Sequence, residues 1–116
     1  SEEALYLQVR NQIIHGIATL QLQEGDELPS VRQMADEIGI NMHTVNKAYT
    51  VLKQEGFIQL DRRKGAVISL DMDKLRELQS MREQMKGILA KGICKGICKD
   101  EVYELVNEIY QEYGGE

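Results

Sequence analysis

Two short polar stretches of this sequence carry the side chains best suited to binding another molecule. The first begins at Asn41 and offers amide, hydroxyl, imidazole and ammonium groups, which can bond to base edges and phosphate oxygens. Its members are Asn41, Met42, His43, Thr44, Asn46 and Lys47. The second is Arg62-Arg63-Lys64, the densest positive cluster of the chain, followed by Gly65. These residue types predict contacts with a nucleic acid.

The first stretch lies in a segment, Leu28–Phe57, that predicts two helices joined by a tight turn. Pro29 and Ser30 mark the start of the first helix, and Gly39 its end. Asn41 caps the second helix, which Gly56 ends. Helical spacing of apolar residues defines two inner faces: Val31, Met34, Ala35 and Ile38, then Val45, Ala48, Tyr49, Val51 and Leu52. The pattern predicts a helix-turn-helix whose second helix enters a DNA groove, although one hairpin of a small helical bundle also fits it.

The second stretch lies between two β-prone runs, residues 57–60 and 66–70. A polar turn containing glycine between such runs predicts a hairpin. A basic hairpin directly after a helix-turn-helix predicts a wing that contacts phosphates or the minor groove. The alternative is a charged turn that only keeps the hairpin soluble.

The N-terminal part of the chain is expected to support these elements. Residues 3–16 predict one amphipathic helix, with Leu5, Val9 and Ile13 on its inner face. Residues 18–27 then predict a loop, with Leu20 and Leu22 packed against the core.

From residue 71 the character of the sequence changes to two amphipathic helices. Asp73 is the expected cap of the first and Gly96 its end. The apolar stripes of the two helices consist of Leu75, Leu78, Met85, Ile88, Leu89, Val102, Leu105, Val106 and Ile109. These stripes need a partner, and a second copy of the chain is the economical one. A hairpin folded back onto its own N-terminal domain remains the alternative.

Composition limits the possible functions. The 116 residues carry a net charge of −5, and neither half is basic: residues 1–70 hold 7 Lys/Arg against 9 Asp/Glu, residues 71–116 hold 7 against 10. DNA binding would therefore require positive groups gathered on one face, doubled in a dimer. No apolar run is long enough for a membrane span, and two cysteines without a signal sequence favour the cytoplasm.

Other chemistry has little support in the residue pattern. Cys94 and Cys98 are four residues apart and, with no partner pair, fit small buried hydrophobes better than a zinc site or a redox switch. No nucleophile–base set, phosphate loop or metal-spaced carboxylate set occurs. We interpret the chain as non-enzymatic, with no cofactor and no metal.

The blocks Leu28-Pro29-Ser30-x-Arg32, Thr44-Val45-x-Lys47-Ala48-Tyr49 and Leu52-x-x-Glu55-Gly56 occur in this order and spacing. Together with Tyr6 and Gly25-Asp26, they resemble the DNA-binding domain of GntR-family transcriptional regulators over about residues 4–70. The short two-helix tail resembles the YtrA subfamily, whose minimal C-terminal part dimerises.

The resemblance implies operator contacts from Arg32, from residues 41–44 and Asn46, and from the wing tip. It also implies a repressor, often encoded beside transporter genes. Two departures alter the pattern: Met42 stands where many relatives have Arg or Pro, and Arg63 replaces the first Gly of a G-x-G wing.

We therefore predict an α+β, mainly α protein, with a winged helix-turn-helix domain in residues 1–70 and a helical dimerisation region in residues 71–116. It would act as a homodimeric repressor on a pseudo-palindromic operator with half-sites about one helical turn apart. The predicted DNA-binding residues are Ser30, Arg32, Asn41, Met42, His43, Thr44, Asn46, Lys47, Arg62, Arg63, Lys64 and Gly65.

Two other functions remain open. One is a winged-helix module that binds a protein, and the other is a ligand- or metal-gated sensor that uses the C-terminal helices. The sequence identifies no small-molecule effector; a groove between the dimer's C-terminal helices and the DNA-binding domains is one place where such a ligand could act.

Overall fold

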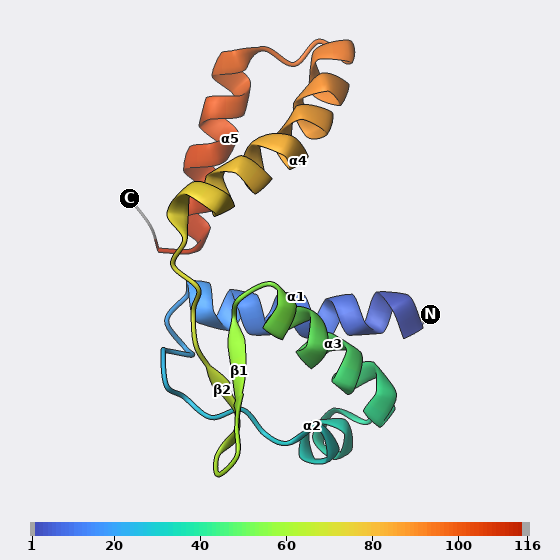
Figure 1. Cartoon of the computed structure of the whole chain (residues 1–116). Coiled ribbons are helices and arrows are strands. Elements are labelled where there is room, and N and C mark those ends of the chain that lie inside the picture. The colour runs from blue at the N-terminus through green and yellow to red at the C-terminus, as the bar shows by residue number, and fades with distance from the viewer. Residues whose placement is uncertain (1, 115–116) are drawn as a thin grey trace. The chain divides into compact units, whose positions relative to one another are not determined.

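The computed structural model describes residues 2–114, which form five helices and two strands (Figure 1). In chain order these are α1 (Glu2–Ala18), α2 (Val31–Ile38), α3 (Met42–Gln54), β1 (Ile58–Asp61), β2 (Gly65–Ile68), α4 (Lys74–Cys94) and α5 (Lys99–Glu112). The chain divides into two compact units, the first ending at Asp71 and the second beginning at Met72. The predicted fold class, a mainly helical winged helix-turn-helix with a two-helix extension, is confirmed.

The first unit is a three-helix assembly closed by a hairpin. Helix α3 packs on both α1 and α2, and the strands pair antiparallel with Ile58 opposite Ile68 and Asp61 opposite Gly65. An isolated antiparallel bridge joins Glu27 to Val67, and so fastens the loop before α2 to the hairpin. The largest fully buried side chains are Val45, Leu52, Ile58 and Ile68. The first two belong to α3 and the last two to the hairpin, so these elements share one core. Burial of each of these side chains contributes about 1.5–3 kcal/mol to stability.

The ends of α2 and α3 are fixed by the local signals that predict them. Ser30 and Gln33 form a reciprocal capping box: Ser30 Oγ accepts from the Gln33 amide at 3.1 Å, and Gln33 Oε1 accepts from the Ser30 amide at 3.1 Å. Gly39 ends α2 with a φ of 70°, which a residue without a Cβ adopts without strain. Asn41 Oδ1 accepts from the His43 amide at 2.7 Å and caps α3.

Three expectations about packing in this unit are wrong. Leu5, expected on the inner face of α1, is 37% exposed. Leu20 is 72% exposed with a φ of 65°, because the chain turns sharply after α1 and carries this side chain outward. Only Leu22 of that loop packs against the core. Ile38, expected on the inner face of α2, is 47% exposed in the last turn of the helix.

The second unit is an α-helical hairpin with little interior. Asp73 Oδ1 accepts from the Arg76 amide at 3.1 Å and caps α4 as predicted. Gly96, with a φ of 83°, lies in the turn between α4 and α5. Among residues 72–114 none is buried, and only Leu89, Gly92 and Val102 are half-buried. No helix of the described residues has the length and apolar character to cross a membrane.

Candidate nucleic-acid interface

The N-terminal half of α3 presents polar side chains on the surface of the first unit. Asn41, His43, Asn46 and Lys47 are exposed, and Met42 is exposed beside them. The opposite face of the same helix is buried through Val45, Ala48, Tyr49 and Leu52. Packing of the buried face fixes the orientation of α3, and therefore determines which of its residues face solvent.

Thr44 does not belong to that outer pattern. Its side chain is only 4% exposed, which contradicts the expectation that it points outward with its neighbours. The reason is helical spacing, because Thr44 precedes Ala48 by one turn and lies on the same buried face. Among the described residues no group hydrogen-bonds to its Oγ1, which is buried as well. The spacing to Ala48 and Leu52 was the signal that could have identified Thr44 as an inner residue.

Helix α2 holds two more predicted contact residues, Ser30 at its cap and Arg32 as its second residue, and both are exposed. Tyr49 of α3 fastens this end of α2 by donating a hydrogen bond from its hydroxyl to the Pro29 carbonyl oxygen at 2.7 Å. Burial raises the pKa of Tyr49 to about 12, and the Glu37 carboxylate adds to the shift. The hydroxyl therefore keeps its proton and remains a donor at neutral pH.

The wing turn is organised by the carboxylate of Asp61. Asp61 Oδ1 accepts from the backbone amide of Lys64 at 2.9 Å and from that of Arg63 at 2.7 Å. These two bonds, the Lys64 bond first, lower the pKa of the Asp61 carboxyl group. Gly65 closes the turn with a φ of 78°. The Asp61 carboxylate thus holds a turn in which Arg63 stands at the position of the first glycine of the G-x-G pattern, and the side chains of Arg62, Arg63 and Lys64 are exposed.

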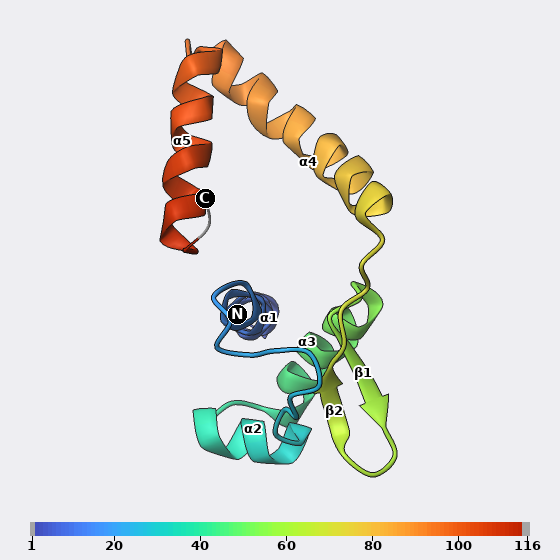
Figure 2. The same cartoon turned by 90° about the vertical axis from the view of Figure 1, so that its left-hand side faces the viewer.

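The helix-turn-helix and the wing lie at one end of the first unit. Both views show α2 and the tip of the β1–β2 hairpin on the same side (Figure 1, Figure 2). Helix α3 begins directly after the α2–α3 turn at Gly39, so its polar N-terminal half starts at this end as well. Within this unit, the fold therefore collects the predicted contact residues, apart from Thr44, on exposed positions of three neighbouring elements.

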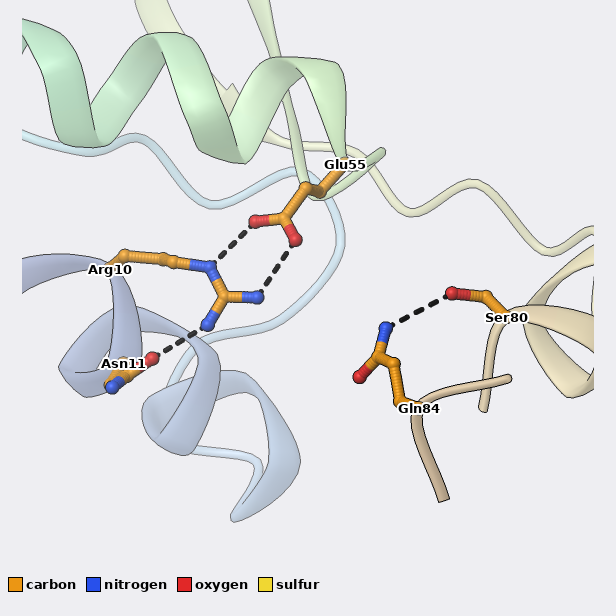
Figure 3. A network of polar contacts seen from close by, with 5 residues as sticks. All are labelled: Arg10, Asn11, Glu55, Ser80 and Gln84. Carbon is orange, nitrogen blue, oxygen red and sulfur yellow. Dashed lines mark hydrogen bonds and ion pairs between the residues drawn. The ribbon is translucent and has the colours of Figure 1, made fainter. Parts of the chain in front are cut away.

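Two contacts between α1 and α3 involve Tyr6, Arg10 and Glu55, which the sequence did not lead us to assign to the site. Lys47 Nζ lies 4.3 Å from the centroid of the Tyr6 ring. Arg10 forms a two-bond ion pair with Glu55, the C-terminal cap of α3 (Figure 3). Both pairs are more than forty residues apart in the chain, so no local pattern could have indicated them.

The predicted dimerisation residues lie on α4 and α5 with their side chains largely accessible. Leu75, Leu78, Met85, Ile88, Leu105, Val106 and Ile109 are exposed, whereas Leu89 and Val102 are half-buried. A groove of about 410 Å³ runs between the two helices, with Met85, Leu89, Ile93, Val102 and Val106 in its lining. Within the second unit, α4 and α5 thus expose apolar side chains along both helices and line the groove between them with apolar residues.

Cys94 and Cys98 differ from their expected role as small buried hydrophobes, because both are exposed free thiols. They also do not lie on one helix: Cys94 is the last residue of α4, and Cys98 is the N-cap of α5. Glu101 Oε1 accepts from the Cys98 amide at 3.0 Å, and this bond is the first cause that lowers the pKa of the Glu101 carboxyl group. In the described part of the chain, no cluster of three or more His, Cys, Asp or Glu residues could hold a metal ion.

Comparison with known proteins agrees with this geometry. Residues 5–68 match the family described as bacterial regulatory proteins, gntR family. The chain belongs to the GntR family. The match spans all the elements from α1 to the wing, so the family assignment covers the whole candidate interface.

Relatives extend the likeness to the C-terminal helices. The HTH-type transcriptional repressor YtrA of Bacillus subtilis is 30% identical over 116 residues, which cover 97% of this chain and 86% of YtrA. The HTH-type transcriptional regulator YhcF of the same organism is 31% identical over 77% of this chain and 75% of its own length. The chain is therefore a YtrA-like GntR regulator, a transcriptional regulator with a DNA-binding helix-turn-helix.

Solved structures of similar proteins share the fold. A crystal structure described as a transcriptional antiterminator from Listeria monocytogenes EGD-e has a TM-score of 0.84 at 31% identity, covering 96% of this chain and 85% of that one. YtrA from Sulfolobus acidocaldarius, described as a GntR-family transcription factor, has a TM-score of 0.56 at 36% identity, with 92% and 88% covered. The winged helix-turn-helix architecture is common to this group.

Proposed function

We propose that this regulator is a repressor that binds a pseudo-palindromic operator as a homodimer. The carrying observation is the set of exposed polar and positive side chains on α2, on the N-terminal half of α3 and on the wing turn. The N-terminal end of a helix also carries partial positive charge, which favours an approaching phosphate. Helix α3 would read base edges through His43 and Asn46, while Arg32 and the wing would contact phosphates or the minor groove.

The charge distribution supports DNA binding despite the net charge of −5. Arg32, Lys47 and the three wing cations account for five of the seven Lys and Arg residues in positions 1–70. Phosphate attraction depends on the charges nearest the DNA, because more distant charges are screened beyond about 8 Å at physiological salt. A local positive surface on an acidic chain is therefore sufficient, and a dimer doubles it.

The apolar surface of α4 and α5 supports the homodimer. Exposed apolar areas of this kind are rare on monomers and usually mark an interface. A second copy presents the same surface, and two-fold pairing is the commonest form of self-association. A two-fold dimer would present two recognition helices to two half-sites, which accounts for the expected operator symmetry. The repressor role rests on similarity to the Bacillus subtilis protein YtrA, described as a repressor.

The test is DNA binding by the full chain, measured by fluorescence anisotropy on DNA from upstream of its own gene across a salt series. The test variant is Arg62→Ala/Arg63→Ala/Lys64→Ala. Tight binding by the wild type should weaken with salt, with a slope of about 0.9 per phosphate contact. The variant should lose affinity at low salt and show a flatter slope, by up to about five units if all three cations of both protomers contact phosphates.

A matched control removes the same charge from other elements. Lys53→Ala/Lys91→Ala/Lys95→Ala changes three exposed lysines, one in the last turn of α3 and two at or after the end of α4. This control should keep the wild-type salt slope. Equal losses in both triple variants would mean that net charge, and not the wing, governs binding. A confirmed dimer that binds no DNA at low salt would instead favour a protein partner, the function that the acidic net charge supports.

A further inference from the structure

The contact between Lys47 and Tyr6 joins the recognition helix to α1. Lys47 is exposed in the second turn of α3, and its Nζ lies 4.3 Å from the centroid of the Tyr6 ring. This distance is within the range of a cation–π interaction, in which an ammonium is attracted to the negative face of an aromatic ring. Tyr6 is half-buried and packs against the core, which restricts the movement of its ring.

Lys47 also shares the outer face of α3 with a predicted base-reading residue. It follows His43 by four residues, and residues four apart are neighbours on one side of a helix. Its ammonium is thus placed along the edge of the α3 surface that lies next to α1. A lysine on a flexible stem samples many rotamers, and confining it before binding lowers the entropy lost when it contacts a phosphate.

We propose that Tyr6 is a positioning residue of the DNA-binding surface, which holds the Lys47 ammonium ready for a backbone phosphate. This inference rests on the proposed DNA-binding function. The ring itself adds no negative charge, so this contact does not weaken the attraction between the ammonium and DNA.

The experiment is a double-mutant cycle on operator affinity with full-length protein. Tyr6→Leu removes the ring but keeps apolar bulk, Tyr6→Phe keeps the ring without the hydroxyl, and Lys47→Ala removes the ammonium. We expect Lys47→Ala to flatten the salt slope by about one unit per protomer. Tyr6→Leu should weaken binding about two- to five-fold per protomer, and Tyr6→Phe should match the wild type. In the Lys47→Ala background, Tyr6→Leu should cause no further loss.

Several results would overturn the inference. An equal loss from Tyr6→Leu with and without Lys47 would mean that Tyr6 supports the fold and does not act through the lysine. Unchanged affinity in Lys47→Ala would leave the contact as a helix–helix interaction only. If the wild type bound no DNA at all, the proposed function itself would fail, so the wild-type salt series is measured first and separates the two failures.

A measurement without a disruptive variant guards against misfolding of Tyr6→Leu. The Lys47 ε-methylene protons lie near the Tyr6 ring, so they should show upfield ring-current shifts in NMR spectra of the DNA-free wild type and of Tyr6→Phe. Absence of these shifts in both proteins would show that the ammonium is not held in solution and would overturn the proposal.

Discussion

Arg10 and Glu55 form a two-bond ion pair that joins the middle of α1 to the C-terminal cap of α3. Arg10 Nε donates to Glu55 Oε1 at 2.6 Å, and Arg10 Nη2 donates to Oε2 at 2.8 Å (Figure 3). The hydrogen bond with Glu55 is the first cause that raises the pKa of Arg10. Arg10 Nη1 also donates to Asn11 Oδ1 at 2.6 Å, which fixes the plane of the guanidinium. This pair and the Lys47–Tyr6 contact both connect α1 with α3.

Breaking this ion pair should lower stability modestly. Glu55→Gln removes the charge and should reduce the free energy of unfolding by about 0.5–1 kcal/mol, since the pair is partly exposed and screened by water. Urea unfolding of Glu55→Gln, Arg10→Ala and the double variant should give a coupling energy of the same size. Glu83→Gln, which breaks the exposed Lys86–Glu83 pair within α4, is the control and should change little. Additive effects of the Arg10 and Glu55 changes would contradict a direct interaction.

Thr44 provides a test of its unexpected burial. Thr44→Val replaces a buried hydroxyl, which no described residue bonds, with a methyl group of similar size. An unmade hydrogen bond costs about 1–3 kcal/mol, so the variant should be as stable as the wild type or more so. Thermal and urea unfolding measure this directly. The control is Thr50→Val, which removes an exposed hydroxyl that donates a hydrogen bond to the Asn46 carbonyl oxygen at 2.8 Å. A loss of more than about 1 kcal/mol in Thr44→Val would mean that its hydroxyl is bonded in solution.

The residues whose roles could be predicted from the sequence form their contacts with residues close to them in the chain. Ser30, Gly39 and Asn41 set helix ends through contacts within three residues or through their own backbone, so a local pattern specifies them. The Asp61 turn is equally local. The elements and the exposed positions of the site could therefore be predicted well.

The errors arose where the polarity of a side chain did not match its burial, and the missed contacts arose where two helices distant in the chain pack together. Thr44 is polar and follows the exposed His43, but it lies one turn before Ala48 on the face of α3 that packs inward. Leu20 is apolar, but the turn after α1 carries it into solvent. Tyr6 and Lys47 meet only because α1 and α3 pack together, and neither residue's surroundings in the chain indicate the other.

The wing turn should depend on pH through Asp61. Its carboxyl pKa is lowered in the folded protein, so the ionised form stabilises the turn above the unfolded value near 3.8. This contribution is lost as the pH falls through the folded pKa, below that value. In NMR titrations the amide signals of Arg63 and Lys64 should move together with the Asp61 carboxyl signal.

At neutral pH, Asp61→Ala should loosen the turn and weaken DNA binding. The control Asp36→Ala, which changes an exposed residue of α2, should leave the turn unaltered. Unchanged Arg63 and Lys64 amide signals in Asp61→Ala would contradict this account.

If the chain dimerises through α4 and α5, a charged residue introduced on their apolar surface should weaken the dimer. Leu78→Asp and Ile109→Asp each place a carboxylate on the apolar surface of α4 or α5. If a second copy covers these positions, burying the charge should cost about 2 kcal/mol or more and raise the dimer dissociation constant at least about 30-fold. Sedimentation measurements over a concentration series report that constant. Leu60→Asp, which changes an apolar residue that is 63% exposed on β1, is the matched control and should leave it unchanged. A dimer that persists in both α4 and α5 variants would place the interface elsewhere. DNA binding should fall together with dimerisation in Leu78→Asp, because a monomer offers one recognition helix to an operator built from two half-sites.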